Sequence, residues 1–463
     1  MRKLREFFNR LVDKYRSVQI LLGSFIVVIL AGTILLGLPI FNNLKPLGIV
    51  DNLFIATSAT CVTGLMPVVT MEQFNLGGQI ILLILIQIGG LGLMSFMALF
   101  VIITRKRLGH SNKQLVMDSL NKFNLSNFND FLKSIFKYTL IFESIGTILF
   151  MIKFIPEYGI GSGFFKALFL SVSSFCNAGI DNISNLSLFK YQNSVLINLV
   201  VMALIILGGL GFTVWFDLKD SLKAHFKKEL TLYQLWNRLL VHTKVVLVAT
   251  TFLLSFGFVF ILFVEYNNVD TLGTLSFGNK IMAALFSSTT LRTAGFATID
   301  FNMLTRATKT MMLVFMLIGG SPGGTAGGIK TSTIVILLLT LNAQIKGKEN
   351  LTIFHREIDR SSFRKAFLIA TLYLAAIFIA MIILSMTENF DYLSILFETC
   401  SAIGTVGLSC GITASLSTIG KLIITGLMLM GRVGPVTIVL SFTSAIKRKE
   451  NSVRYSKAEL LVG

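Results

Sequence analysis

The chain has 463 residues, of which 54% are hydrophobic and only 14% charged, and its formal net charge is +18. A soluble domain would carry nearer a quarter of charged residues, so this composition predicts a polytopic membrane protein. It disfavours a basic nucleic-acid binder, because the positive charge is divided among segments that lie between long apolar runs.

The first apolar run, from Val18 to Phe41, follows a basic N-terminus. The run is too long for the apolar core of a cleaved signal peptide, and no cleavage pattern of small residues follows it. About 20 apolar residues are enough to cross a bilayer. We therefore expect this run to be the first transmembrane helix.

Basic residues gather in five segments, which are 1–18, 104–137, 217–244, 344–365 and 447–463. These segments carry 30 of the 41 Lys and Arg residues but only 12 of the 23 Asp and Glu residues. An excess of Lys and Arg is typical of cytosolic loops. The pattern predicts a multi-pass protein of the plasma membrane with both termini in the cytosol.

A motif that begins with Leu-Phe and ends with Gly occurs four times. Its copies are LFIATSATCVTG, LFLSVSSFCNAG, LFSSTTLRTAG and LFETCSAIGTVG, which close on Gly64, Gly179, Gly295 and Gly407. A second glycine motif follows each closing glycine by 24 to 29 residues, as IGGLG, LGGLG, IGGSPGG and MGRVGP. Two motifs that recur in one register predict an internally repeated protein.

Each repeat reads as an apolar span, a short polar segment and a second span. Segments of 10 to 14 residues are too short to cross and are typical of re-entrant loops, which need protein or water around them. Four such loops on one axis would line a pore, because glycine lets the backbone approach an ion and rings of carbonyls can replace its hydration shell. For the second glycine motif, close packing of helices remains an equal alternative.

These motifs, in order and over nearly the whole chain, resemble those of the Trk/Ktr/HKT superfamily of potassium transporters. The length and the short ending VRYSKAELLVG resemble its Ktr-type membrane subunit most. The resemblance implies an all-α fold of four pseudo-symmetric repeats, with eight transmembrane helices and four re-entrant pore loops around one ion pore. It divides the chain into a cytosolic N-terminus (1–18), four pore repeats (19–104, 105–218, 219–343 and 344–446) and a cytosolic tail (447–463).

The resemblance also assigns K⁺ binding to backbone carbonyls in a selectivity filter. The implied residues are Val62, Thr63, Gly64, Asn177, Ala178, Gly179, Thr293, Ala294, Gly295, Thr405, Val406 and Gly407. Gly64 stands where some relatives carry Ser and transport sodium, so it favours potassium. Because the four loops differ in sequence, a Trk-type or less selective K⁺/Na⁺ transporter is the alternative.

The segment 318–330, IGGSPGGTAGGIK, resembles the gate of the family. A glycine costs about 1 kcal/mol and a proline about 3 kcal/mol inside a helix, so six glycines and a proline predict a break here. A helical rise of about 1.5 Å per residue after Gly295 places this segment well below the filter. The implied gate residues are Gly319, Gly320, Ser321, Pro322, Gly323, Gly324, Thr325, Ala326, Gly327, Gly328, Lys330 and Arg432.

Three cations at membrane depth allow two interpretations each. Arg432, where a charge costs at least ~2.5–3.5 kcal/mol, either forms an electrostatic barrier in the pore below the filter, or caps carbonyls or pairs with an acid in a packed interface. Lys330 either has a role in the gate, by holding the gate loop or by repelling cations, or extends its ammonium group to the cytosolic interface. We expect Arg292 to be structural, either tying loop carbonyls or pairing with Glu398.

Other site chemistry is weakly indicated. Cys61 and Cys176 could hold a soft metal, but a free cysteine is more often a small buried apolar residue. The sequence GGSPG fits a nucleophile motif at Ser321, yet no His lies at membrane depth to activate it. The sequence GGTAGGIKTS lacks the phosphate-loop lysine after its glycine. We therefore expect that the protein is not an enzyme. An intramembrane hydrolase is the alternative.

Members of the Ktr branch form homodimers that dock on a cytosolic ring of nucleotide-binding (RCK-type) subunits. This chain has no dinucleotide-binding glycine motif after a strand, so the resemblance implies that this regulator is a separate protein. We expect the bilayer as surroundings, no nucleic acid, no bound cofactor, and K⁺ as the substrate ion. Sodium dependence, and channel-like against sodium-coupled transport, stay open.

Overall fold

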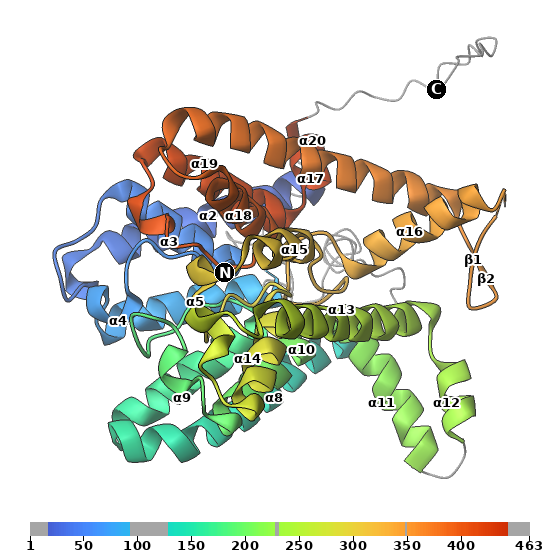
Figure 1. Ribbon diagram of the computed structural model, residues 1–463, viewed down its shortest axis with the longest axis horizontal. Coiled ribbons are helices and arrows are strands. Elements are labelled where there is room, and N and C mark those ends of the chain that lie inside the picture. Colours follow the sequence, from blue (N-terminus) through green and yellow to red (C-terminus); the bar gives the residue numbers. More distant parts are fainter. Residues whose placement is uncertain (1–16, 93–127, 227–230, 348–349, 443–463) are drawn as a thin grey trace, which may run out of the picture.

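The computed structural model describes residues 17–92, 128–226, 231–347 and 350–442. The expected cytosolic segments 1–18, 104–137 and 447–463 lie wholly or largely outside these ranges. The described chain is mostly helical, and its helices pack side by side (Figure 1).

Four helices are long and apolar enough to cross a bilayer, namely α2 (Ser17–Gly37), α8 (Phe128–Tyr158), α13 (Val241–Glu265) and α17 (Arg360–Thr387). Large apolar side chains on them are exposed, among them Val27, Phe263 and Phe378. Since lipid tails are as apolar as these side chains, the exposure fits helices that contact a bilayer.

A short helix follows each long one, namely α3 (Ile49–Cys61), α9 (Ile160–Cys176), α14 (Phe277–Thr290) and α18 (Tyr392–Gly404). These helices carry the Leu-Phe motif and are too short to cross a bilayer. Their last turns are almost entirely buried. The polar part of each motif is therefore placed inside the protein.

A second helix completes each unit, namely α5 (Leu76–Leu91), α10 (Val195–Gly209), α15 (Arg306–Leu317) and α19 (Thr418–Val433). Each ends at the second glycine motif. The chain bends by 98° between α10 and α11 (Phe212–Phe226) and by 99° between α19 and α20 (Pro435–Phe442). After α15 an irregular segment leads to α16 (Thr331–Ile345).

These bends reduce the number of spans that length alone identifies. Among the described residues, four helices pass the length test, or up to six if each bent pair is one span, against the eight expected. At both bends the cause is a glycine, because Gly211 and Gly434 hold left-handed φ of 90° and 93°. An L-residue with a side chain rarely takes this conformation inside a helix.

The remaining elements are short. They are α4 (Thr70–Gln73), α12 (Leu232–Arg238), strands β1 (Leu351–Ile353) and β2 (Arg356–Ile358), and the single turns Pro39–Phe41, Phe189–Tyr191, Val269–Gly273, Phe301–Met303 and Thr413–Ser415. The antiparallel β1–β2 hairpin corrects the all-α expectation. Strands of three residues are too short to leave an alternating pattern in the sequence.

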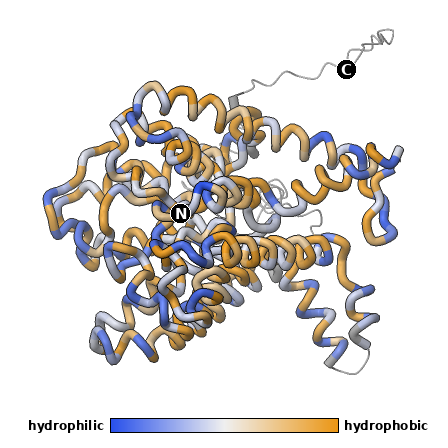
Figure 2. The backbone as a smooth tube through the Cα atoms, in the orientation of Figure 1, coloured by the Kyte–Doolittle hydropathy of each residue, from blue (hydrophilic) through white to orange (hydrophobic). Residues whose placement is uncertain are grey.

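Helices α11 and α12 and the hairpin project from the same side of the molecule (Figure 1). The ring of Trp236 on α12 meets that of Phe354 in the hairpin edge to face, with centroids 6.2 Å apart. This region is rich in hydrophilic residues, whereas the shafts of the long helices are hydrophobic (Figure 2). The described parts of two basic segments, 217–244 and 344–365, thus lie together.

Candidate functional site

The four short helices lead into four equivalent turns, which we call the glycine loops (62–64, 177–179, 293–295 and 405–407). The first residue of each loop has a left-handed backbone although it is not glycine, with φ of 56°, 59°, 59° and 53° at Val62, Asn177, Thr293 and Thr405. Such φ values are uncommon outside glycine. The same strained turn is thus built four times.

Hydroxyl groups from the short helices fix these loops. Ser58 Oγ accepts from Gly64 N at 3.0 Å, and Ser401 Oγ accepts from Gly407 N at 3.1 Å. In the other two loops the hydroxyl donates to the carbonyl after the glycine, from Ser173 Oγ to Ile180 O at 2.5 Å and from Thr290 Oγ1 to Phe296 O at 2.7 Å. These side chains hold the backbone in place.

The four closing glycines meet each other. A Cβ atom added to Gly64, Gly179, Gly295 or Gly407 would lie 2.6, 2.6, 2.7 or 2.2 Å from a carbonyl oxygen of the neighbouring loop. Those oxygens belong, in the same order, to Ala178, Ala294, Val406 and Thr63. The contacts run from the first loop through the fourth and back to the first. The glycine loops therefore form a closed ring.

All four closing glycines line one outer cavity of about 490 Å³. The charged residues in its lining are Asp181 and Asp300. A concave surface with acidic side chains attracts cations, because low-dielectric walls focus the field. The geometry places this cavity on one side of the ring.

On the other side lies the irregular stretch 318–330, which we call the glycine-rich segment. Two backbone hydrogen bonds join the two ends of this segment: Gly319 N donates to Ile329 O at 2.9 Å, and Ile329 N donates to Leu317 O at 3.1 Å. Ser321 N and Thr325 N donate to Gly209 O and Gly208 O, at 2.9 and 3.1 Å. The segment is thus fastened to the end of α10.

The glycine-rich segment reaches the glycine loops, which corrects the expected separation. Thr325 Oγ1 donates to Phe175 O at 3.1 Å, and a Cβ on Gly327 would lie 2.1 Å from Thr405 Oγ1. The chain first continues away from Gly295 to Thr305 before α15 begins at Arg306. Only the residues of α15 therefore descend as a helix, and fewer than the sequence distance suggested.

Arg432 joins three parts of this inner side. Its Nη1 donates to Thr325 O, and its Nη2 donates to Gly89 O and Gly90 O at the end of α5. Among the described residues it forms no ion pair. Its hydrogen bonds to three carbonyl oxygens agree with the carbonyl-capping interpretation. Arg432 also belongs to the lining of an inner cavity of about 280 Å³.

Lys330 lines the same inner cavity. Its Nζ donates to Ala326 O at 2.6 Å, so this side chain holds the glycine-rich segment itself. Within the described ranges no carboxylate pairs with it.

The expected pair between Arg292 and Glu398 does not form, and this expectation is corrected. Arg292 is buried, and its Nε and Nη2 have no hydrogen-bond partner among the described residues. Glu398 instead accepts from Thr413 Oγ1. Both residues lie next to the glycine loops of neighbouring units, and sequence spacing could not show whether their side chains meet. Asn177 Nδ2 donates to Arg292 O at 3.2 Å, so the arginine backbone does support a neighbouring loop.

Cys61 and Cys176 are both fully buried free thiols. Cys176 Sγ lies 3.8 Å from Gln87 Oε1 and 4.0 Å from Glu143 Oε1. No group of three His, Cys, Asp or Glu side chains suited to a metal occurs in the part of the chain that the structure describes. The thiols behave as small packed residues.

The second glycine motif packs helices. A Cβ on Gly89, Gly208 or Gly431 would lie 2.0, 2.0 or 2.1 Å from the carbonyl oxygens of Thr60, Phe175 and Ile403. Each of these carbonyls belongs to the last turn of the short helix in the same unit. For these three glycines the packing interpretation holds, and it brings each second helix against its glycine loop.

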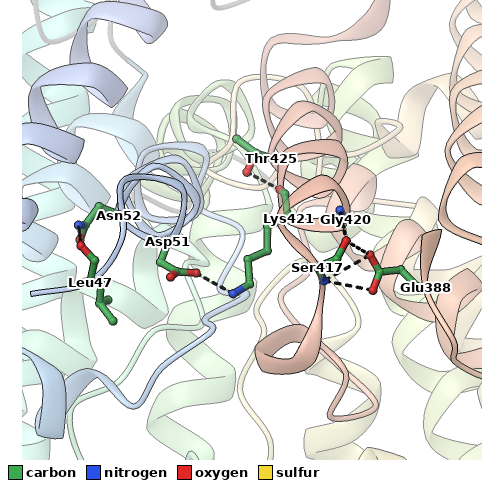
Figure 3. Close-up of polar contacts among 8 residues, drawn as sticks. All are labelled: Leu47, Asp51, Asn52, Glu388, Ser417, Gly420, Lys421 and Thr425. Atoms are coloured by element: carbon green, nitrogen blue, oxygen red, sulfur yellow. Dashed lines mark hydrogen bonds and ion pairs between the residues drawn. The ribbon is translucent and has the colours of Figure 1, made fainter.

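An ion pair missed by the sequence analysis joins the last unit to the first. Lys421 Nζ on α19 lies 2.7 Å from Asp51 Oδ1 in the first turn of α3 (Figure 3). Nearby, Glu388 at the end of α17 accepts from Ser417 N at 3.1 Å, which fixes the start of α19 (Figure 3). In the sequence, the available signal was a charged residue in an otherwise apolar unit, as Asp51 and Lys421 both are. Only the closed ring shows that these two residues are neighbours.

A ring of four backbone loops between two cavities, within a bundle of lipid-facing helices, defines a multi-pass membrane transport protein. The chain belongs to the TrkH family, described as cation transport protein, whose family model matches residues 10–454. Members of this family are ion transporters and not enzymes.

Relatives of known name match nearly the whole chain. The chain is 37% identical over 450 residues to the Ktr system potassium uptake protein B of Bacillus subtilis, covering 97% of each chain. It is 38% identical to the potassium/sodium uptake protein NtpJ of Enterococcus hirae, covering 98% of this chain and 99% of that one. The crystal structure of the potassium transporter TrkH from Vibrio parahaemolyticus shares the fold, with a TM-score of 0.73 at 18% identity over 92% of this chain and 84% of that one.

Proposed function

We propose that this protein takes up potassium ions across the plasma membrane through the ring of glycine loops. The observation that carries the proposal is the mutual contact of the four closing glycines around one cavity. Such a ring offers backbone carbonyls in place of an ion's hydration shell. The relatives named for potassium uptake support the choice of ion.

The oxygens that bind K⁺ in this proposal are the carbonyls of the first two residues of each glycine loop. The four units then form an eight-span pore, in which each second helix counts as one span despite its glycine break. In this proposal the termini, α12 and the β1–β2 hairpin all lie on the cytosolic side, because all of them belong to segments rich in Lys and Arg.

The glycine-rich segment acts as the gate in this proposal. Support comes from its place directly behind the ring, where it contacts Phe175 and Thr405. Arg432 holds it closed by donating to Thr325 O. A flexible segment in this position blocks the path until a partner beneath draws it aside.

The partners we propose are a second copy of this chain and a separate cytosolic ring of nucleotide-binding subunits. No cofactor is needed in the chain itself. The proposal includes Na⁺ as a second ion that takes part in transport, because one relative is named a potassium/sodium uptake protein.

A less selective K⁺/Na⁺ transporter is the second candidate. It is favoured by the unequal first residues of the glycine loops, which are Val62, Asn177, Thr293 and Thr405. A site that is only approximately fourfold fits one ion size less strictly than a symmetric one.

The test is potassium uptake in a strain that lacks its own uptake systems, with and without external sodium and with and without the regulatory subunit. We expect potassium uptake that sodium stimulates. Equal uptake of both ions would favour the second candidate, and no uptake with the regulator present would contradict both. Ser321→Ala tests the alternative of an intramembrane hydrolase, which would lose all activity without this hydroxyl, whereas a transporter with Ser321 in its gate would still take up potassium.

A further inference from the structure

A buried carboxylate lies behind the fourth glycine loop. Glu398 on α18 is 1% exposed and stands nine residues before Gly407. The equivalent residues of the other units, directly after the Phe of each motif, are Ile55, Leu170 and Ser287. Burying a carboxyl group is costly unless hydrogen bonds compensate it. Its presence in a single unit therefore calls for a local partner.

The partners of Glu398 come from the chain after the loop. Thr413 Oγ1 donates to Glu398 Oε1 and lies 3.0 Å from Ser409 Oγ, which in turn accepts from Gly411 N at 3.0 Å. Thr413 is 4% exposed. The carboxylate thus joins the helix that enters the loop to the segment that leaves it.

The segment that leaves the loop forms part of the outer cavity. Ser409, Gly411 and Thr413 line this cavity together with the four closing glycines. A change in their position would move the wall beside Gly407. A Cβ added to Gly64 or Gly295, in the first and third loops, would lie 3.3 Å from the Cα of Gly407. The hydrogen bonds of Glu398 therefore act on the geometry of the ring's outer end.

We propose that Glu398, through Thr413 and Ser409, is a positioning residue that fixes the outer mouth at the fourth glycine loop and so contributes to discrimination among monovalent cations. The inference rests on the proposed permeation through the ring. It assigns Glu398 no direct contact with the ion.

The test compares Thr413→Val with Thr413→Ser in the full-length protein with its regulator. Valine keeps the volume but removes the donor, whereas serine keeps it. We expect the valine variant to lower the ratio of K⁺ to Na⁺ uptake roughly threefold to tenfold, as the loss of one hydrogen bond of ordinary net strength implies, and serine to restore the ratio. Ser409→Ala should lower it in the same direction.

Thr271→Val is the matched control. Thr271 Oγ1 donates to the buried Glu265 at 2.8 Å, so it repeats the same chemistry, and it lies outside the lining of the outer cavity. We expect it to lower the melting temperature without changing the ion ratio.

An unchanged ion ratio in both Thr413→Val and Ser409→Ala, with a selective wild-type protein, would overturn this inference and leave the proposed function standing. A wild-type protein that shows no selective cation uptake would instead remove the proposed function itself.

Discussion

At the scale of single residues, the first positions of the glycine loops carry the strain. A non-glycine residue with left-handed φ costs on the order of 1–3 kcal/mol and persists only where its surroundings fix it. Around Val62 and Thr405 the surroundings are the bonds from Thr63 N to Ser58 O and from Val406 N to Ser401 O, both 2.8 Å. The loops are therefore held rigidly, which the proposed selection between ions of similar size requires.

Gly64→Ser is the first prediction. A Cβ at this position would lie 2.6 Å from Ala178 O, and the φ of 100° disfavours any side chain. We expect the ring to distort and discrimination against sodium to weaken, which relative K⁺ and Na⁺ uptake measures. Gly159→Ser is the control, because Gly159 has a similar φ of 79° with no atom within 4 Å. If Gly64→Ser keeps wild-type selectivity, Gly64 does not belong to the filter.

Arg432→Ala is the second prediction. The side chain donates to Thr325 O, Gly89 O and Gly90 O, and a hydrogen bond from a charged group contributes about 1.5–3 kcal/mol. Its loss should free the glycine-rich segment and raise the uptake rate at unchanged selectivity. A variant of wild-type stability with ordinary uptake would argue against Arg432 as part of the gate. Lower expression and melting temperature alone would mean a purely structural role.

At the scale of elements, the glycine-rich segment replaces a continuous helix between α15 and α16. It is fastened by hydrogen bonds to the end of α10 and by Thr325 Oγ1 to Phe175 O. Because this segment has no helical hydrogen-bond ladder of its own, moving it breaks these bonds and the one from Arg432 to Thr325 O but does not unwind a helix.

Deletion of residues 321–327 is the third prediction. It removes the contacts with Gly208 O, Gly209 O and Phe175 O, so we expect faster uptake that no longer responds to the regulatory subunit, at unchanged selectivity. Uptake rates with and without the regulator measure both effects. A folded deletion variant that transports no faster and still responds to the regulator would show that the glycine-rich segment is not the gate.

The ion pair between Asp51 and Lys421 gives the fourth prediction. It joins α3 to α19 and so closes the ring between the first and last units. Lys421→Gln should lower stability by about 1 kcal/mol and loosen the first glycine loop, while the exchanged pair Asp51→Lys with Lys421→Asp should recover part of both. Melting temperature and ion ratio report the two effects.

Lys309→Gln is the matched control for that pair. Lys309 and Lys421 both stand ten residues before the first glycine of the second motif, but Lys309 Nζ donates to Asn302 O within its own unit, at 2.8 Å. An equal loss of selectivity in both glutamine variants would show that closure of the ring is not the cause.

At the scale of the whole molecule, orientation in the membrane gives the fifth prediction. The four native cysteines are buried, so cysteines introduced at exposed sites report topology. A membrane-impermeant maleimide added outside should label Lys45→Cys and spare Glu357→Cys in the β1–β2 hairpin, since both sites are exposed and the hairpin belongs to a basic segment. The reverse pattern would invert the proposed orientation.

The sequence by itself determined the membrane class, the fourfold recurrence and the positions of the closing glycines. Hydrophobic runs and glycine motifs are local signals, and they recur at readable distances along the chain. The helical break at 318–330 was readable for the same reason, because glycine and proline act through their own backbone.

Only the tertiary structure decided which groups meet. It separated Arg292 from Glu398, paired Asp51 with Lys421 and tied Glu398 to Thr413. It also brought the glycine-rich segment up against Phe175 and Thr405. Each of these contacts depends on how the units close into a ring. No single unit encodes that closure, because it arises from packing between residues far apart in the sequence.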